Sequence, residues 1–444
     1  MSMLKELRRH PSAVAGLVIL VIFVGFSIYT VFAFPYSEAI KLWRAGPGVW
    51  DELPRRAAPV WYDYFTRKKL PRTIIVSLED GGTMTAEPAG DGKNRVEIVF
   101  PFEYAYDGFP KEISLFVEAN IAARGESYSV YMRKPNGETV TLTEDINFIQ
   151  SQAYRISQEG GLRMKLGGLA PHVGLFVEDP HRKPDQPLKG RYELVMRGDL
   201  SEEAELSVAK LVVYGQVHGL AGTDHLRRDL TVALSWGAPI ALMFGVLAAV
   251  GTQISTFILG GIGTWFGGRL DAIFQRVTEV FMILPLLAVL IMIGHFYSRS
   301  IWVMLGMVIL LNVFSSPLKV YRAMFLQAKE APYIEAARAY GAGNFRIIFR
   351  YLLPRLTPVL LPNMVIVIPT FVFLEASLAV LGLGDPVLPT WGKIIFDART
   401  NDALYMGNYY WMIQPAVLLM VIGFSFALVG YTLDRILNPR LRKL

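Results

Sequence analysis

Residues 335–354 read EAARAYGAGNFRIIFRYLLP and lie between two long apolar runs. The stretch is rich in arginine, alanine and glycine, whereas the segments on both sides have the composition of membrane-spanning helices. Its arginines keep it in water or at the level of the lipid headgroups. This contrast decides the fold, because it predicts a chain that crosses a bilayer repeatedly and carries a helical hairpin outside it.

The local chemistry of this stretch predicts two helices. Pro332 suits the first turn of a helix, so we predict a short helix over residues 333–340. Gly341 or Gly343 can adopt the left-handed conformation that ends a helix. Asn344 is a favourable N-cap for a second helix over residues 345–353, and Pro354 marks the junction with the next apolar run.

The composition of the whole chain agrees with a membrane protein. Of its 444 residues, 52% are hydrophobic and 18% are charged, whereas soluble domains carry about 25% charged residues. The first apolar run has no small-residue cleavage site, so we predict a retained helix and not a signal peptide. Runs of about 20 apolar residues can cross the hydrocarbon core, and six are predicted, at about 13–34, 231–262, 275–297, 300–325, 356–383 and 411–433.

The distribution of positive charge predicts the orientation. Six spans place both termini on one side, and sixteen Lys and Arg residues fall in the segments on that side, against five in the short segments opposite. Positive residues favour the cytoplasmic side, so both termini are expected in the cytoplasm of a multi-pass protein of the plasma (inner) membrane. The net charge of +6 is therefore explained by the orientation in the membrane. Nucleic-acid binding would need a basic patch on a folded domain, so no nucleic-acid partner is expected. The chain has no cysteine, which excludes disulfides and thiolate metal sites.

A long segment between the first two spans has a different pattern. Seven stretches in it alternate or are β-branched, and Asn136-Gly137 lies between two of them as a hairpin turn. We predict an inserted β-rich, sandwich-like domain on the extracytoplasmic side. The expected organisation is therefore a tail and first helix over 1–35, the β-rich insert over 36–217, and a five-helix core over 218–444 with its cytoplasmic hairpin at 328–355.

Few ionisable or helix-breaking residues lie within the predicted spans. Glu375 is the main intramembrane candidate for a functional acid, with Glu279 near the inner end of the third span. Both also fit a simpler role as a cap or hydrogen-bond partner of a neighbouring helix. Pro285 and Pro369 lie inside spans and suit either gentle kinks and packing or hinges that move during gating.

The hairpin closely resembles the signature loop of binding-protein-dependent ABC importer permeases. That loop has Glu-Ala-Ala, three residues, Gly, nine residues, often Ile, one residue and Leu-Pro. This chain matches at Glu335, Ala336, Ala337, Gly341 and Leu353-Pro354, and has Tyr351 where Ile is frequent. The resemblance narrows to the C-type subunit of the oligopeptide/dipeptide/nickel permease family through GTDHLRRD (222–229), with Arg227 where Gly is usual, LEASLAVLGLG (374–384) and LNPRLRKL (437–444).

The resemblance implies an α-helical type I importer fold with six spans and a transport role without enzymatic activity. It also implies that the hairpin docks into a partner ATPase. The implied contact residues are Tyr333, Glu335, Ala336, Ala337, Arg338, Gly341, Leu353 and Pro354. The chain contains no GxxxxGK[ST] phosphate loop, so ATP and Mg²⁺ are expected on the partner, and no cofactor or metal in this chain. The implied partners are two ATPase subunits, a homologous B-type permease, an extracytoplasmic substrate-binding protein and membrane lipid.

The segment before the second span admits two interpretations. Gly222, Thr223, Asp224, Arg228 and Asp229 are expected either to contact the binding protein or seal an outer gate, or to form a structural turn with local ion pairs. The insert is expected to be a docking surface for the binding protein or a scaffold against the partner permease. The family resemblance favours di- or oligopeptides as the cargo, with nickel or another small solute as the alternative.

Two other classes of protein remain open at this point. One is an ATP-independent channel or sensor with an outer β domain. The other is a membrane-bound enzyme, for which the insert offers imaginable metal ligands in His172, His181, His218, Asp179 and Asp185. Their spacing matches no tight metal site, so loop residues are the better interpretation.

Overall fold

The computed structural model describes residues 10–44, 46, 48–90, 93–119, 127–147, 152–178, 186–201 and 206–437. The chain forms two compact units, one from residues 1–44 with 232–444 and one from residues 45–231. Helix α3 (Tyr36–Arg44) belongs to the first, helical unit, and the segment 218–231 belongs to the second, β-rich unit. The terminal stretches 1–9 and 438–444, whose positive charges enter the predicted orientation, lie outside the described residues.

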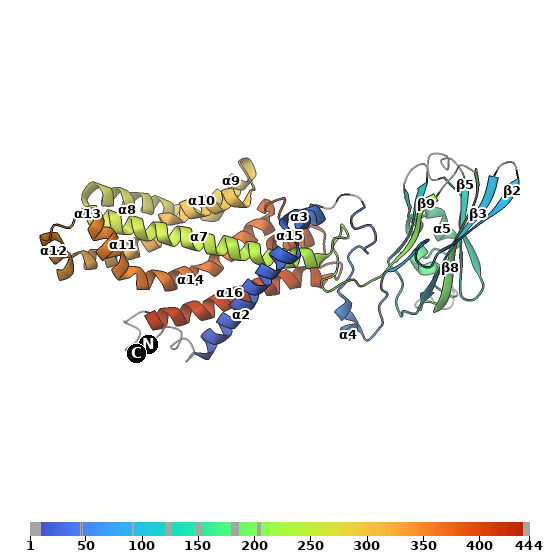
Figure 1. The fold of residues 1–444 in the computed structure, drawn as a ribbon, viewed down its shortest axis with the longest axis horizontal. Helices are drawn as coiled ribbons and strands as arrows, with labels where there is room; N and C mark the ends of the chain where they lie inside the picture. The colour runs from blue at the N-terminus through green and yellow to red at the C-terminus, as the bar shows by residue number, and fades with distance from the viewer. Residues whose placement is uncertain are drawn as a thin grey trace. The chain divides into compact units, whose positions relative to one another are not determined.

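The helical unit is made of apolar helices and the short hairpin between two of them (Figure 1). The helices are α2 (Pro11–Ala33), α3, α7 (Leu230–Phe266), α8 (Gly268–Ile283), α9 (Leu286–Phe296), α10 (Ile301–Val313), α11 (Ser316–Lys329), α12 (Pro332–Ala339), α13 (Asn344–Ile347), α14 (Leu353–Leu378), α15 (Trp391–Thr400) and α16 (Tyr409–Leu437). Two π-type turns, Ile348–Leu352 and Ala379–Leu383, flank α14 at its two ends.

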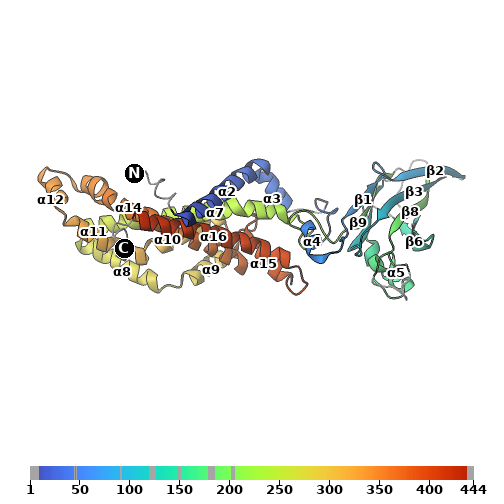
Figure 2. The ribbon, with the colours of Figure 1, turned by 90° about the horizontal axis from the view of Figure 1, so that it is seen from below.

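Small residues let the long helices of this unit approach closely. Helix α16 packs against both α2 and α14 (Figures 1 and 2). A Cβ atom added to Gly16 would lie 2.8 Å from the Ser425 carbonyl oxygen, and one added to Gly237 would lie 2.1 Å from the Trp391 indole. Helices that pack in lipid gain little from the hydrophobic effect, so this close van der Waals contact holds them together.

Four of the helices in the described part of the chain are long and apolar enough to cross a bilayer, namely α2, α7, α14 with the turns that flank it, and α16. The predicted spans at 275–297 and 300–325 are not continuous helices. Each is a bent pair, with 79° between α8 and α9 and 46° between α10 and α11, so the number of spans reaches six if each pair counts as one. Pro285 lies at the first break, where its ring prevents the helix from continuing.

The β-rich unit consists of two antiparallel sheets. The four-stranded sheet has the order β1 (Ile74–Ser77), β9 (Leu206–Tyr214), β4 (Glu112–Ala119) and β7 (Gln152–Tyr154). The five-stranded sheet has the order β2 (Thr83–Gly90), β3 (Lys93–Tyr104), β8 (Gly190–Ser201), β5 (Ser127–Arg133) and β6 (Thr139–Asn147). Short helical elements are η1 (Val60–Tyr62), α4 (Asp63–Thr66), η2 (Ile156–Gln158), α5 (Gly160–Lys165) and α6 (Pro171–Gly174).

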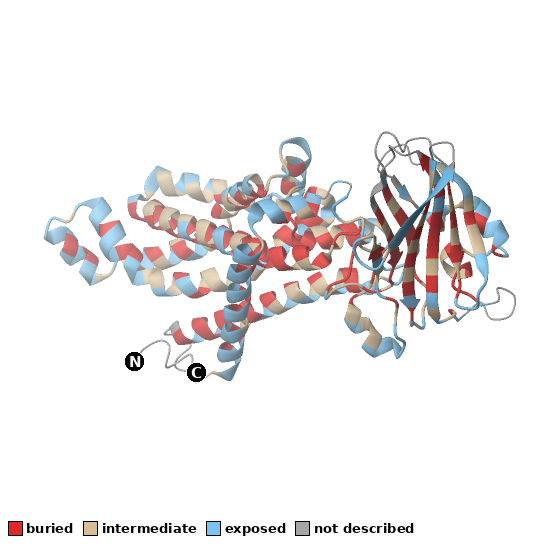
Figure 3. Cartoon of the chain, turned by 45° about the vertical axis from the view of Figure 1, so that its right-hand side comes forward, coloured by how far each residue is buried: buried red, intermediate tan, exposed pale blue. Residues whose placement is uncertain are grey.

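One hydrophobic core is shared by both sheets, which makes the unit a β-sandwich. Along β3 every second side chain is buried from Val96 to Tyr104, and these side chains join others from β4, β8 and β9 in one cluster (Figure 3). Alternation places the remaining side chains on the opposite face of the sheet. All seven predicted strands are confirmed, and β2 and β7 are additional.

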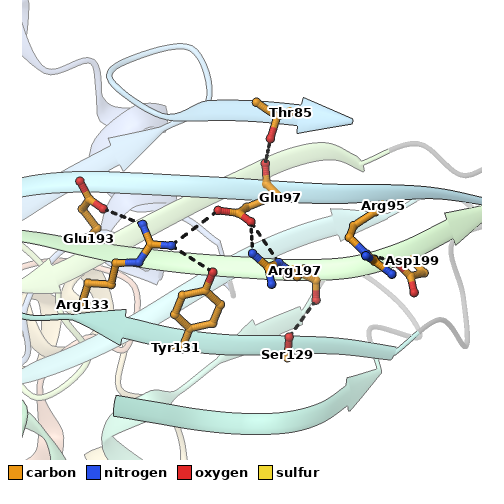
Figure 4. Close-up of polar contacts among 9 residues, drawn as sticks. All are labelled: Thr85, Arg95, Glu97, Ser129, Tyr131, Arg133, Glu193, Arg197 and Asp199. Atoms are coloured by element: carbon orange, nitrogen blue, oxygen red, sulfur yellow. Dashed lines mark hydrogen bonds and ion pairs between the residues drawn. The ribbon is translucent and has the colours of Figure 1, made fainter. Parts of the chain in front are cut away.

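The other face of the five-stranded sheet carries charged side chains that pair across strands (Figure 4). Arg133 contacts Glu193 at 3.2 Å, Arg95 contacts Asp199 at 3.0 Å, and Arg197 pairs with Glu97. All three pairs are directly opposite in the strand register, where opposite charges stabilise a sheet. The paired charges on this face therefore neutralise each other, and the face is suited to contact with water.

The chain enters and leaves the β-rich unit along two adjacent segments, which we call the stalk (residues 54–60 and 216–224). They are joined by backbone hydrogen bonds from Ala58 N to the Gln216 oxygen at 2.9 Å and from His218 N to the Ala58 oxygen at 2.8 Å. A further bond runs from Leu230 N, at the start of α7, to the Gly222 oxygen at 3.0 Å. The stalk is thus hydrogen-bonded to Leu230, the first residue of α7.

Candidate functional site

The predicted hairpin is present at residues 332–352, at one end of the helical unit (Figures 1 and 2). Helix α12 begins at Pro332 and ends at Ala339, with Tyr340 as its C-cap. Gly341 follows with a φ of 76°, its N–H donates to the Arg338 oxygen at 2.9 Å, and Ala342 N donates to the Ala337 oxygen at 3.0 Å. This pair of bonds is a Schellman cap, and its left-handed residue is why glycine fits at position 341.

The second half of the hairpin differs from the prediction. Asn344 is the first residue of α13 and not its N-cap; Gly343 holds the cap position without a side-chain bond. After four residues α13 passes into the π-type turn Ile348–Leu352, which leads directly into α14. Residues 344–381 form one helical segment, the rod, which Pro354 does not interrupt because it lies in the first turn of α14, directly after the π-type turn. Gly382, just beyond the rod, has a non-helical φ of 86°.

The inner face of the hairpin is anchored in the ends of three membrane helices. Ile334, Ala337 and Leu352 are buried in one cluster with aromatic and aliphatic side chains of α7, α11 and α14. The guanidinium carbon of Arg338 lies 4.5 Å from the centre of the Trp265 ring, and Lys329 Nζ donates to the Trp265 oxygen at 3.1 Å. The hairpin is therefore packed against all three helices.

The outer face contains most of the residues predicted to contact a partner. Tyr333, Glu335, Ala336 and Arg338 are exposed along α12, and Gly341 and Pro354 are exposed as well. Ala337 and Leu353 are buried, so these two residues of the predicted set hold the hairpin together. The exposed face combines the carboxylate of Glu335 with the small side chain of Ala336. Small side chains permit close approach of another protein.

An ion pair between Arg322 and Asp271, which we call the polar clamp, joins α11 of one bent pair to α8 of the other. Arg322 of α11 donates through Nε to Asp271 Oδ1 of α8 at 2.7 Å and through Nη2 to Oδ2 at 2.6 Å. Both breaks border one cavity of about 70 Å³, lined by Phe281, Leu284, Leu286, Val289, Leu311, Asn312 and Ser315. Helices α8 and α11 are therefore joined to each other, while a break separates α8 from α9 and another separates α11 from α10.

Glu375 lies near the end of α14 that is remote from the hairpin. It is buried and lines a cavity of about 20 Å³ together with Arg299 and Asp385. Twenty-two residues separate it from Leu353, or about 33 Å of α-helix. Glu279 is instead half-exposed and pairs with Arg276 at 2.9 Å. The continuous rod thus connects the hairpin with the predicted intramembrane acid.

The residues predicted before the second span form a closed polar turn within the stalk. Asp224 accepts hydrogen bonds from Arg228 N at 2.9 Å and from Arg228 Nε at 2.5 Å, and both side chains are buried. Thr223 donates to the Pro54 oxygen at 2.5 Å, and Gly222 has a φ of 81°. Burial lowers the pKa of His218, with an opposing effect from Asp229 beside it. This arrangement favours the structural interpretation of the turn.

Arg227 attaches this turn to the β-sandwich. Its backbone has a φ of 67°, which explains why glycine is the usual residue in the resembling sequences. Its guanidinium donates to the Leu53 oxygen at 2.5 Å, pairs with Glu112 of β4 and lies 4.2 Å from the centre of the Tyr214 ring of β9. The side chain therefore compensates for a strained backbone by binding to two strands.

We expect Arg227→Gly to loosen the junction between the stalk and the four-stranded sheet. The change relieves about 1–2 kcal/mol of left-handed strain but removes charged hydrogen bonds of about 1.5–3 kcal/mol and a cation–π contact of about 1–2 kcal/mol. Amide exchange in β4 and β9 should become several-fold faster, as measured by mass spectrometry. Arg67→Gly is the matched control, because Arg67 has a φ of 55° with an exposed side chain; slower exchange in both variants would show that strain dominates.

No metal centre is found in the described part of the chain, where no three His, Cys, Asp or Glu side chains lie together in a way that would hold an ion. His172 and His218 are among those residues. His181, Asp179 and Asp185 lie outside the described ranges.

Two known protein families match this sequence. Residues 232–443 match the family described as "Binding-protein-dependent transport system inner membrane component". Residues 2–47 match the "N-terminal TM domain of oligopeptide transport permease C". These two matches cover the helical unit and leave residues 48–231 uncovered, which is nearly the whole of the β-rich unit.

Similar curated proteins carry the names of peptide transport subunits. The chain is 30% identical over 223 residues to the dipeptide transport system permease of Bacillus subtilis, covering 50% of this chain and 69% of that protein. It is 32% identical over 225 residues to the oligopeptide transport system permease of the same organism, covering 50% and 72%. A peptidoglycan transport system permease of Agrobacterium fabrum is 31% identical over 206 residues, covering 46% and 54%.

Proposed function

Since this chain belongs to the family of binding-protein-dependent transport system inner membrane components, we propose that it is a permease subunit of an ABC importer for di- or oligopeptides. The names of its relatives support peptides as the cargo. The observation that carries the proposed mechanism is the hairpin, whose exposed carboxylate at Glu335 lies opposite a face buried among three membrane helices.

The hairpin is the proposed contact for an ATPase. Helix α12 presents Tyr333, Glu335, Ala336 and Arg338 to a groove on the ATPase surface, and the Schellman cap at Gly341 holds α12 at a fixed angle to the rod. ATP and Mg²⁺ are bound and ATP is hydrolysed by a pair of such ATPase subunits, and this chain performs no catalysis. Their closure and opening move the hairpin, and the rod transmits this movement across the bilayer as a rigid-body tilt.

The remaining parts of the assembly follow from the same proposal. A homologous B-type permease completes the translocation pore, of which this chain forms half. Both termini lie in the cytoplasm, six spans cross the inner membrane, and the β-rich unit lies on the outer side. There a substrate-binding protein delivers the peptide. Alternating access then exposes the pore first to the outside and then to the cytoplasm.

The proposal predicts ATP-dependent peptide uptake by the reconstituted complex. Proteoliposomes containing the chain, its B-type partner, the ATPases and the binding protein should accumulate a labelled dipeptide or oligopeptide only when ATP and Mg²⁺ are supplied. Unlabelled peptide should compete, and Ni²⁺ should not. Accumulation that continues without ATP would support the channel or sensor instead, and competition by Ni²⁺ alone would assign the alternative cargo.

A further inference from the structure

An exposed aromatic patch lies beside the stalk of the β-rich unit. It consists of Trp61, Tyr64 and Phe65 on η1 and α4, with Leu220 on the returning segment of the stalk. Tyr64 is 87% exposed, Phe65 is 77% exposed and Leu220 is 77% exposed. An exposed patch of large apolar side chains on a protein surface is typical of an interaction site.

The indole N–H of the patch is hydrogen-bonded within the protein. Trp61 Nε1 donates to the Leu220 oxygen at 2.9 Å, and the Trp61 and Phe65 rings meet edge to face with 6.0 Å between their centres. The backbone N–H of Val60 donates to the Gly219 oxygen at 3.0 Å. Trp61 is therefore held by one hydrogen bond and one ring contact, and its segment is bonded to the returning segment of the stalk.

The start of a membrane helix lies close to this patch along the chain. Leu230 N, in the first turn of α7, donates to the Gly222 oxygen at 3.0 Å, and Gly222 is two residues from Leu220. Two residues span at most about 7 Å, so the Leu220 backbone lies within about 10 Å of the start of α7. Helix α7 has 37 residues and is about 55 Å long, so its ends extend past a hydrocarbon core of about 30 Å into the headgroup layers.

Basic side chains complete the surface. Arg67 and Lys68 follow α4 directly and are exposed, and the stretch from Trp61 to Lys69 reads WYDYFTRKK, with three bases and one acid. Trp and Tyr are enriched at the level of lipid headgroups because one end of each ring is polar and the other apolar. Lys and Arg beside them attract anionic phospholipids.

We propose that the surface formed by Trp61, Tyr64, Phe65, Leu220, Arg67 and Lys68 inserts into the headgroup region of an anionic phospholipid bilayer. The rings enter the boundary between headgroups and acyl chains, while the two basic side chains bind phosphate groups. The β-rich unit is then attached to the membrane at a third place besides its two chain connections. This inference does not depend on transport, because lipid contact requires neither an ATPase nor a cargo.

The absence of native cysteine makes the test direct. The full chain carrying Phe65→Cys is labelled with bimane and reconstituted in vesicles of phosphatidylcholine and phosphatidylglycerol that contain doxyl-labelled lipid. Met84→Cys is the matched control, since Met84 is an exposed apolar residue on β2 of the same unit. Doxyl quenching at position 65 should be about twice that at position 84 or more, because contact quenching requires the label at the acyl boundary.

The contribution of charge gives a second measurement. Removing Arg67 and Lys68 together by substitution with Gln should weaken insertion by up to about fivefold for each charge, and the loss should occur only in vesicles that contain phosphatidylglycerol. Aqueous iodide that quenches the label at position 65 as strongly as the label at position 84 would overturn the proposal. Protection of position 65 that appears only after a substrate-binding protein is added would overturn it as well, and would assign the patch to that protein.

Discussion

Reversal of one charge on the hairpin, Glu335→Arg, should abolish association with the ATPase subunits. The Glu335 carboxylate is exposed on α12, and we propose that it pairs with a Lys or Arg side chain of the ATPase groove. Loss of one partner of a charge pair in an interface costs about 2–5 kcal/mol, which weakens binding about 30-fold or more. The expected result is that the ATPases no longer co-elute with the permease in mild detergent and that peptide uptake ceases.

The controls separate lost docking from lost folding. Glu335→Gln keeps the size and hydrogen-bonding ability of the side chain, so it should retain part of the association. Glu79→Arg makes the same charge reversal at an exposed position of the β-rich unit and should have no effect. Undiminished co-elution of the ATPases with the Glu335→Arg variant would show that the coupling surface lies elsewhere.

Breaking the clamp between α8 and α11 should uncouple hydrolysis from transport. Arg322→Glu places two carboxylates opposite each other where a bidentate pair with Asp271 now holds the helices together. Hydrogen bonds to charged groups contribute about 1.5–3 kcal/mol each, so we expect uptake to fall about tenfold or more. ATP hydrolysis should continue, because α12 and its exposed face are unchanged.

The exchanged pair provides the decisive control. Asp271→Arg combined with Arg322→Glu restores opposite charges and should recover most of the uptake. Arg276→Glu breaks an exposed pair with Glu279 on the same helix, and exposed pairs contribute at most about 1 kcal/mol, so uptake should change little. A double variant that stays as inactive as Arg322→Glu alone would refute the clamp.

Much of the fold follows from local patterns in the sequence. The apolar runs, the alternation in seven strands and the Gly341 turn depend on neighbours in the chain, and all are present in the structure. Strand β2 escaped prediction because it contains Pro88 and ends at Gly90. It lies at the edge of its sheet, with a register shift between these two residues, and an edge strand tolerates a missing N–H donor.

The features that escaped prediction depend on tertiary contacts. The break after α10 occurs at Phe314-Ser315, just before Pro317 in the first turn of α11. This proline is a local signal for the start of a new helix, but the hydropathy pattern on which the span was predicted does not record bending. The role of Arg227 depends on Glu112 and Tyr214, which are distant in sequence. The burial of Ala337 beside the exposed Ala336 depends on which face of α12 meets Trp265 and its neighbours.

The side-by-side segments of the stalk have an evolutionary consequence. The segment that enters the sandwich is hydrogen-bonded to the segment that leaves it. The sandwich can therefore be inserted or removed as a unit, because the two ends of the remaining chain lie close together. A long insertion with adjacent ends costs little loop-closure entropy and leaves the surrounding frame undisturbed.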